Sequence, residues 1–114
     1  MRVTEQEVTL GPLDLVPQGE GRNFALGKER IAVFHTRSGE LFATQADCPH
    51  RHGPLADGLV GDKTVICPLH AWKFDLSTGQ SYGGDCELRT YPVRVTSDGL
   101  IALSPGLPES VSSV

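Results

Sequence analysis

The sequence predicts an all-β domain of short antiparallel strands joined by tight turns. The 114 residues include 13 glycines and 8 prolines, a share that favours many turns over long helices. Short apolar runs recur between these turn signals, and no stretch places its apolar residues at the helical period of about 3.6. The length is that of one domain.

The first half of the chain alternates apolar runs with turn residues. A strand is expected over 2–10, where Val3, Val8 and Leu10 are apolar, and Gly11-Pro12 is expected to end it. A short turn or half-helix over 13–17 and a loop over 18–21 follow. Further strands are expected at 23–26, at 31–36 with its apolar stretch Ile31–Phe34, and at 40–44 after a hairpin turn at Ser38-Gly39.

Residues 47–86 interrupt this pattern, because they hold all three cysteines and three of the four histidines. Within them, short strands are expected at 64–66 and 72–74, with a turn at 77–80. Strands at 91–95 and 100–103, joined by a turn at Asp98-Gly99, complete the domain. We therefore expect one domain over 1–104 with a loop-rich insert at about 47–86, followed by a flexible tail over 105–114.

The net charge of −4 is mildly acidic, which disfavours nucleic acid as a partner, because phosphate binding requires a basic face. No apolar run approaches the roughly 20 residues that span a membrane, and residues 1–10 lack the apolar core of a signal peptide. We therefore expect a cytoplasmic protein with neither a membrane nor a nucleic acid as its partner.

The cysteines and histidines form two short pairs. Three cysteines are an odd number for a disulfide framework, and cysteines close to histidines are typical of metal sites. The pairs are Cys48-Pro49-His50 and, 16 residues later, Cys67-Pro68-Leu69-His70. Each pair offers one thiolate and one imidazole, and the short spacing lets two tight loops face each other. A proline in each pair fixes the backbone φ and stiffens the loop.

At these residues the chain resembles the Rieske family. The resemblance extends beyond the ligands to Gly53-Pro54-Leu55 with Gly58, to Ala71–Asp75 with Thr78-Gly79, and to Tyr91-Pro92-Val93. It covers roughly residues 3–104. The resemblance implies the Rieske fold, an antiparallel β-sandwich base with an inserted subdomain in which two apposed loops bind the cluster.

The resemblance also implies one [2Fe–2S] cluster, with Cys48 and Cys67 on one iron and His50 and His70 on the other. Two ferric ions, two sulfides and two cysteinates sum to a neutral site, whereas four cysteinates would leave it doubly negative. Because an electron enters a neutral site more easily, histidine ligation raises the reduction potential.

Residues around the cluster adjust that potential. High-potential members of the family carry an additional disulfide between the two loops and hydroxyls that hydrogen-bond the cluster. Here Gly53 and Leu69 stand where those cysteines would fall, and Trp72 and Phe74 stand at the hydroxyl positions. Fewer donors to the sulfurs stabilise the reduced state less. We therefore predict a potential in the lower half of the Rieske range of about −150 to +300 mV.

Other interpretations of these residues remain open. Zinc also binds two cysteines with two histidines, although the single residue between Cys48 and His50 is short for a zinc finger. His52 is an alternative ligand to His50, but the one-residue spacing favours His50. We interpret His35 as a structural or surface residue. Cys86 is interpreted as a small buried residue that could instead be redox-active.

No dinucleotide-binding or Walker A motif accompanies the ligand pairs, so the chain is expected to pass single electrons to a redox partner protein and not to be catalytic alone. Ile31–Phe34, Phe42–Ala46, Gly58–Gly61 and Thr90–Val95 look similar to the small subunit of assimilatory NAD(P)H nitrite reductases, which we favour. The alternative is a stand-alone Rieske ferredoxin that donates electrons to an aromatic-ring-hydroxylating dioxygenase. A third interpretation is a structural module without redox function, which the intact ligand set disfavours.

Overall fold

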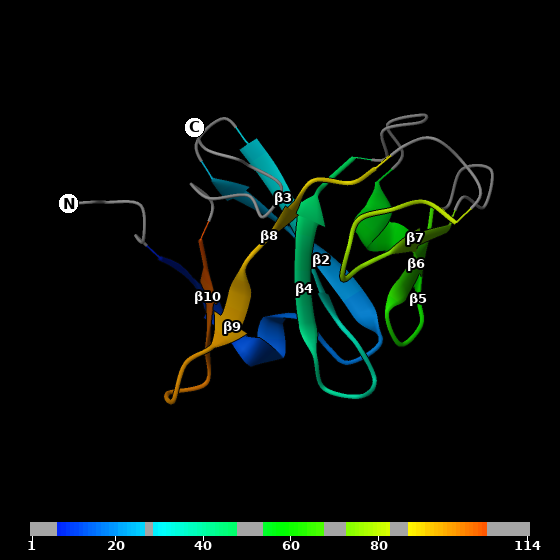
Figure 1. Ribbon diagram of the computed structural model, residues 1–114. Helices are drawn as coiled ribbons and strands as arrows, with labels where there is room; N and C mark the ends of the chain where they lie inside the picture. The colour runs from blue at the N-terminus through cyan, green and yellow to red at the C-terminus, as the bar shows by residue number, and fades with distance from the viewer. Residues whose placement is uncertain (1–6, 27–28, 48–53, 68–72, 83–86, 105–114) are drawn as a thin grey trace.

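The computed structural model (Figure 1) describes residues 7–26, 29–47, 54–67, 73–82 and 87–104. Within these ranges the chain forms ten short strands and two single-turn 3₁₀ helices. All of the strand pairings among them are antiparallel. The predicted all-β class is confirmed. In the same ranges, no helix has the length and apolar character needed to cross a membrane.

Two sheets form the base of the molecule, with the strand orders β1-β10-β9 and β2-β3-β4-β8. Their strands are β1 (Val8–Pro12), β2 (Glu20–Leu26), β3 (Glu29–His35), β4 (Leu41–Gln45), β8 (Thr90–Tyr91), β9 (Val93–Val95) and β10 (Leu100–Leu103). A base core joins the two sheets. Its buried members are Val16, Ile31, Val33, Ala43, Tyr91, Ile101 and Leu103.

A third, smaller sheet of order β5-β6-β7 lies beside the second base sheet (Figure 1). It consists of β5 (Leu59–Val60), β6 (Thr64–Ile66) and β7 (Lys73–Asp75), and the 3₁₀ helix η2 (Leu55–Asp57) precedes it. A second core, here called the insert core, packs this sheet against the base. Its buried members are Ala32, Phe34, Leu55, Val65, Cys67, Phe74, Leu76 and Leu88.

Strand β3 is the wall that the two cores share. Ile31 and Val33 belong to the base core, whereas the alternate residues Ala32 and Phe34 belong to the insert core. Successive side chains of a strand point to opposite faces, so the unbroken apolar run Ile31–Phe34 is covered on both faces. The sequence of β3 therefore fixes the side of the base on which the insert sheet packs.

The predicted end of the first strand at Gly11-Pro12 is wrong. β1 continues to Pro12, which is paired with Leu100 of β10, and the register of the pairing shifts between Thr9 and Gly11. Gly11 has a φ of 136°, a conformation that side chains disfavour. This glycine therefore accommodates a bulge within the strand instead of ending it.

The predicted loop at 18–21 is also too long, because β2 already begins at Glu20. Gly21 lies opposite Phe34 of β3. A Cβ at Gly21 would lie 2.7 Å from the Phe34 ring and 3.2 Å from Cα of Ala56. The glycine is therefore a strand residue that makes room for an aromatic ring and for η2, and it does not mark a turn.

Several short elements agree with the predictions. The half-helix expected within 13–17 is η1 (Leu13–Leu15), and β6 and β10 have the predicted bounds. The glycines of the two predicted hairpin turns, Gly39 and Gly99, have positive φ values of 95° and 80°. Strand β5 and helix η2 were not predicted, because two or three residues carry no periodic signal. The domain limits of 1–104, the insert at 47–86 and the tail at 105–114 stay predictions.

Candidate functional site

Of the four predicted ligands, Cys67 lies among the described residues, and Cys48, His50 and His70 lie outside them. Cys67 directly follows β6 and is 1 % exposed. It belongs to the insert core together with Leu55, Val65 and Phe74. His52 and Cys86 also lie outside the described residues.

The two ends of the first ligand segment, 48–53, are held together by main-chain contacts. Asp47 and Pro54 form an isolated antiparallel bridge. Next to it, the Leu55 main-chain N–H donates to the carbonyl oxygen of Ala46 at 3.0 Å. Nη2 of Arg30 lies 2.9 Å from Oδ1 of Asp47 in an exposed ion pair. The chain therefore leaves the base at Asp47 and returns to it at Pro54.

The ends of the second ligand segment, 68–72, are held by the β6–β7 hairpin. Ile66 of β6 pairs with Lys73 of β7, and the next pair is formed by the buried residues Val65 and Phe74. Cys67 occupies the first position after the hairpin strand. The buried pair beneath it means that the ligand segment starts from a packed sheet and not from a free loop.

A third segment, 83–86, begins and ends beside the same hairpin. The main-chain N–H of Tyr82 donates to the carbonyl oxygen of Lys73 at 3.0 Å. Isolated bridges join Phe74 to Ser81 and Gln80 to Glu87. This segment and the second ligand segment therefore share the β7 edge of the insert sheet.

A close approach between η2 and β6 connects the two ligand segments. Gly58 follows η2, and Leu59 of β5 pairs with Ile66 of β6. A Cβ at Gly58 would collide with the carbonyl oxygen of Ile66. The glycine therefore lets the chain that returns from the first segment pack directly against the strand that leads into the second.

Asp75 supports the turn that follows β7. Its Oδ1 accepts hydrogen bonds from the Ser77 hydroxyl at 2.6 Å and from the Ser77 and Thr78 main-chain N–H groups at 2.8 and 3.3 Å. The hydrogen bond from the Ser77 hydroxyl is the main cause that holds the pKa of the Asp75 carboxyl below its ordinary value of 3.8. The ionised form of Asp75 thus fastens the turn.

The predicted donor set has the composition that a Rieske cluster requires, namely two thiolates and two imidazoles. Cys67 supplies the observation that tests the fit: it stands at a packed strand end, where a ligand can be held without freedom to turn away. A match to the family model of the Rieske [2Fe–2S] domain covers residues 6–94.

The chain belongs to the Rieske [2Fe–2S] family. The expected cofactor, one [2Fe–2S] cluster, is therefore confirmed, and the zinc alternative is set aside. The assignment of Cys48, His50, Cys67 and His70 as the ligands stays a prediction. The Rieske fold expected from the sequence is confirmed by the structures of its relatives given below.

Two curated relatives illustrate the range of the family. The chain is 39 % identical over 89 residues to a 4β-methylsterol monooxygenase of Methylococcus capsulatus, covering 68 % of this chain but only 24 % of that protein. It is 35 % identical over 99 residues to the anthranilate 1,2-dioxygenase ferredoxin subunit of Burkholderia cepacia, covering 85 % and 90 %. Other relatives are ferredoxin components of naphthalene and biphenyl dioxygenases.

Two solved structures share the fold of this Rieske protein. An NADH-dependent nitrite reductase small subunit assigned in Mycobacterium tuberculosis has a TM-score of 0.79 at 25 % identity, covering 86 % of this chain and 93 % of that one. The ferredoxin of Sphingomonas yanoikuyae B1 has a TM-score of 0.77 at 28 % identity, covering 87 % and 98 %. The fold is thus common to both functional settings that the sequence suggested.

His35 has a structural position in this Rieske domain. It is 8 % exposed, and its Nδ1 donates to the carbonyl oxygen of Val16 at 2.8 Å. This bond ties the end of β3 to the segment that follows η1. The imidazole thus serves the base, as one of the two sequence interpretations held.

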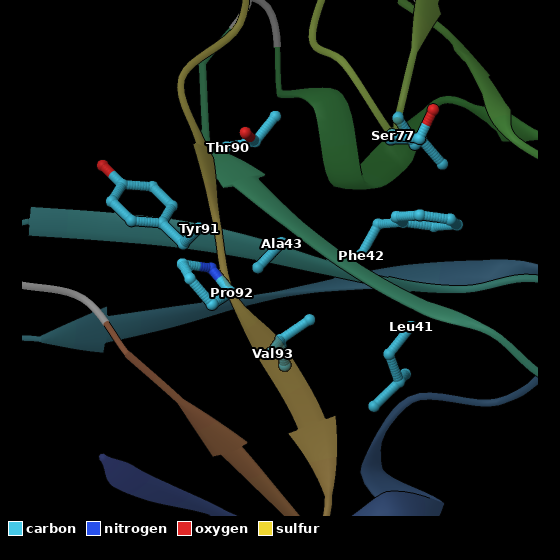
Figure 2. Close-up of a pocket in the computed structure, with 9 residues that line it drawn as sticks. Leu41, Phe42, Ala43, Ser77, Thr90, Tyr91, Pro92 and Val93 are labelled. Carbon is cyan, nitrogen blue, oxygen red and sulfur yellow. The ribbon is translucent and has the colours of Figure 1, made fainter. Parts of the chain in front are cut away.

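A hollow of about 270 Å³ lies between β4, the link from β8 to β9 and the turn at Ser77 (Figure 2). Phe42, Leu76, Pro92 and Val93 contribute apolar walls. No carboxylate, imidazole or amine is among its lining residues. The hollow therefore offers no group that exchanges protons near neutral pH, and we assign no role to it.

Proposed function

We propose that this chain is a one-electron carrier of the Rieske ferredoxin type that supplies an oxygenase component. The observation that carries the proposal is the match over nearly full length to dioxygenase ferredoxins, which covers 90 % of the anthranilate 1,2-dioxygenase ferredoxin subunit. A component of that size has room for the cluster domain and little else. The chain is then an exchange partner and not the site of substrate oxidation.

In this proposal Cys48 and Cys67 bind one iron and His50 and His70 bind the other. When bound, the cluster stores one electron at a time. The chain's own contribution is to hold the four ligands. Asp47 and Pro54 fasten the ends of the first ligand segment, and Ile66 and Lys73 fasten those of the second.

The second candidate is the small subunit of a nitrite reductase, which the sequence patterns favoured. A specific observation supports it as well, since the nitrite reductase small subunit of Mycobacterium tuberculosis has a TM-score of 0.79. The curated ferredoxin relatives lead us to place the ferredoxin first. In both settings the partner is a soluble redox protein, and we place the carrier in the cytoplasm.

The experiment that tests the proposal compares two electron acceptors. The cluster-loaded chain is reduced and mixed, in separate reactions, with a ring-hydroxylating oxygenase component plus its substrate and oxygen, and with a nitrite reductase large subunit plus nitrite. The ferredoxin proposal predicts rapid reoxidation of the cluster by the oxygenase and formation of hydroxylated product. Rapid reoxidation by the nitrite reductase subunit alone would favour the second candidate.

A matched control separates electron transfer from protein binding. Cys67→Ser exchanges the thiolate for a hydroxyl of similar size, so we expect it to lose the cluster while the fold of the base is retained. The variant should therefore support no turnover with either acceptor. Turnover by a cluster-free Cys67→Ser chain would contradict an electron-carrier function.

A further inference from the structure

The side chain of Gln45 makes two hydrogen bonds to segments that lie far apart in the sequence. Its Nε2 donates to the carbonyl oxygen of Asp47 at 2.8 Å. Its Oε1 accepts from the main-chain N–H of Arg89, also at 2.8 Å. The main-chain N–H of Gln45 donates to the carbonyl oxygen of Arg89 at 2.9 Å, so one residue holds Arg89 by both its N–H and its C=O.

These contacts lie at the starting point of the first ligand segment. The Asp47 carbonyl that Gln45 holds belongs to the peptide unit whose nitrogen is that of Cys48. Because a peptide unit is planar, a bond that fixes its carbonyl fixes the plane of the whole unit. Gln45 therefore acts on the last peptide group before the first predicted ligand.

The other end of the Gln45 side chain leads to the third segment. Arg89 follows Leu88, whose main-chain N–H donates to the carbonyl oxygen of Gly79 at 2.6 Å. Leu88 is a buried member of the insert core, as are Cys67 and Phe74. Gln45 thus links the first ligand segment to the packed layer that carries the second.

The ion pair between Arg30 and Asp47 is a weaker restraint than Gln45. Its two side chains are 52 % and 41 % exposed, and solvent-exposed ion pairs of this kind contribute little to stability. It also holds the Asp47 side chain, whereas Gln45 holds the Asp47 main chain. The amide of Gln45 is therefore the contact best placed to fix the path of the ligand segment.

We infer that Gln45 is a positioning residue for the iron–sulfur cluster. Its side chain ties the first ligand segment to the insert core and so sets the geometry in which the cluster exchanges its electron. The inference rests on the proposed function, because it requires Cys48 and His50 to be ligands. Sequence reasoning did not find this role, since the contact joins residues 44 positions apart.

The test uses the full, cluster-loaded chain and two glutamines. Gln45→Met keeps the length of the side chain and removes both of its hydrogen bonds. Gln45→Glu keeps an acceptor for the Arg89 N–H but cannot donate to the Asp47 carbonyl. Gln80, an exposed residue within the insert, provides the controls Gln80→Met and Gln80→Glu, which match the two changes in size and charge.

Three readouts are measured: the ratio of reduced to oxidised cluster at the wild-type midpoint potential, the g values of the reduced cluster by electron paramagnetic resonance, and the rate of cluster release to a chelator. For Gln45→Met we expect at least a threefold change in the ratio, shifted g values and roughly threefold to tenfold faster release, the lower end of the effects that residues outside the ligand shell produce. Gln80→Met should match the wild type. Gln45→Glu should differ from Gln80→Glu in the same readouts.

Gln45 variants that match their Gln80 counterparts in all three readouts would overturn the inference while the wild-type cluster leaves the proposed function intact. A wild-type chain that binds no cluster would overturn both. Should Gln45→Met fail to fold, the comparison of Gln45→Glu with Gln80→Glu decides, because the Gln45→Glu variant retains the bond to Arg89.

Discussion

Truncation of Leu55 tests whether the insert core holds the cluster site to the base. Leu55 is fully buried and lies in the first turn after the first ligand segment, in the same core as Phe34 of β3 and Phe74 of β7. Because these neighbours are anchored in two different sheets, the site cannot readily collapse around the missing atoms. Leu55→Ala should therefore lower the free energy of unfolding by about 3 kcal/mol, which corresponds to a fall in Tm of about 12 °C for a domain of this size.

The matched control is Leu103→Ala. Leu103 is also fully buried, but it belongs to the base core. The same atoms are removed, so we expect a similar loss of about 3 kcal/mol. Any difference between the two variants in the behaviour of the cluster then reports on position and not on global stability.

The assay measures thermal unfolding by circular dichroism and cluster release by the decay of visible absorbance in excess chelator, well below either Tm. Both variants should show similar falls in Tm, and Leu55→Ala alone should release its cluster at least several-fold faster than the wild type. Equal release rates for the two variants, at equal losses of stability, would refute the reasoning that the insert core restrains the ligand segments.

Three further predictions concern single features. Gly58→Ala should destabilise the protein by about 1–3 kcal/mol in urea unfolding, because the added Cβ meets the Ile66 carbonyl oxygen; an unchanged urea midpoint would contradict this contact. Asp75 has a lowered pKa, so its contribution is present above pH 3.8 and is lost as the pH falls through the folded-state value. The difference in urea midpoint between the wild type and Asp75→Asn, which keeps an acceptor but does not titrate, should therefore shrink from about pH 5 to about pH 3; a constant difference would argue against it. Redox titration should give a midpoint in the lower half of the range of about −150 to +300 mV, and a value well above zero would show that the missing hydroxyls and disulfide do not decide the potential.

The sequence was sufficient for the features that depend on local patterns. Turn glycines such as Gly39 and Gly99 need a positive φ, and the neighbouring Ser or Asp marks the turn without any knowledge of the fold. The apolar run Ile31–Phe34 predicted a strand, and its lack of alternation already indicated burial on both faces. The spacing of Cys67 and His70 belongs to the same class, because ligand pairs are adjacent in the chain.

Features that depend on contacts between distant residues could not be predicted. Gly21 has the local character of a loop, but the Phe34 ring across the sheet makes it a strand residue. Gln45 carries no motif at all, and its role arises only when the fold brings Arg89 beside it. The two-residue strand β5 is likewise defined by its pairing with β6 rather than by its own sequence.

The central claim is that two histidines and two cysteines hold one [2Fe–2S] cluster in this chain. The most direct measurement is pulsed electron paramagnetic resonance on the reduced protein labelled with ¹⁵N-histidine, in the wild type and in His50→Ala, His52→Ala and His70→Ala. The claim predicts two strongly coupled histidine nitrogens in the wild type and in His52→Ala, and loss of the Rieske signal in the other two variants. A reduced cluster without coupled histidine nitrogens, or a signal that depends on His52 and not on His50, would contradict the assignment.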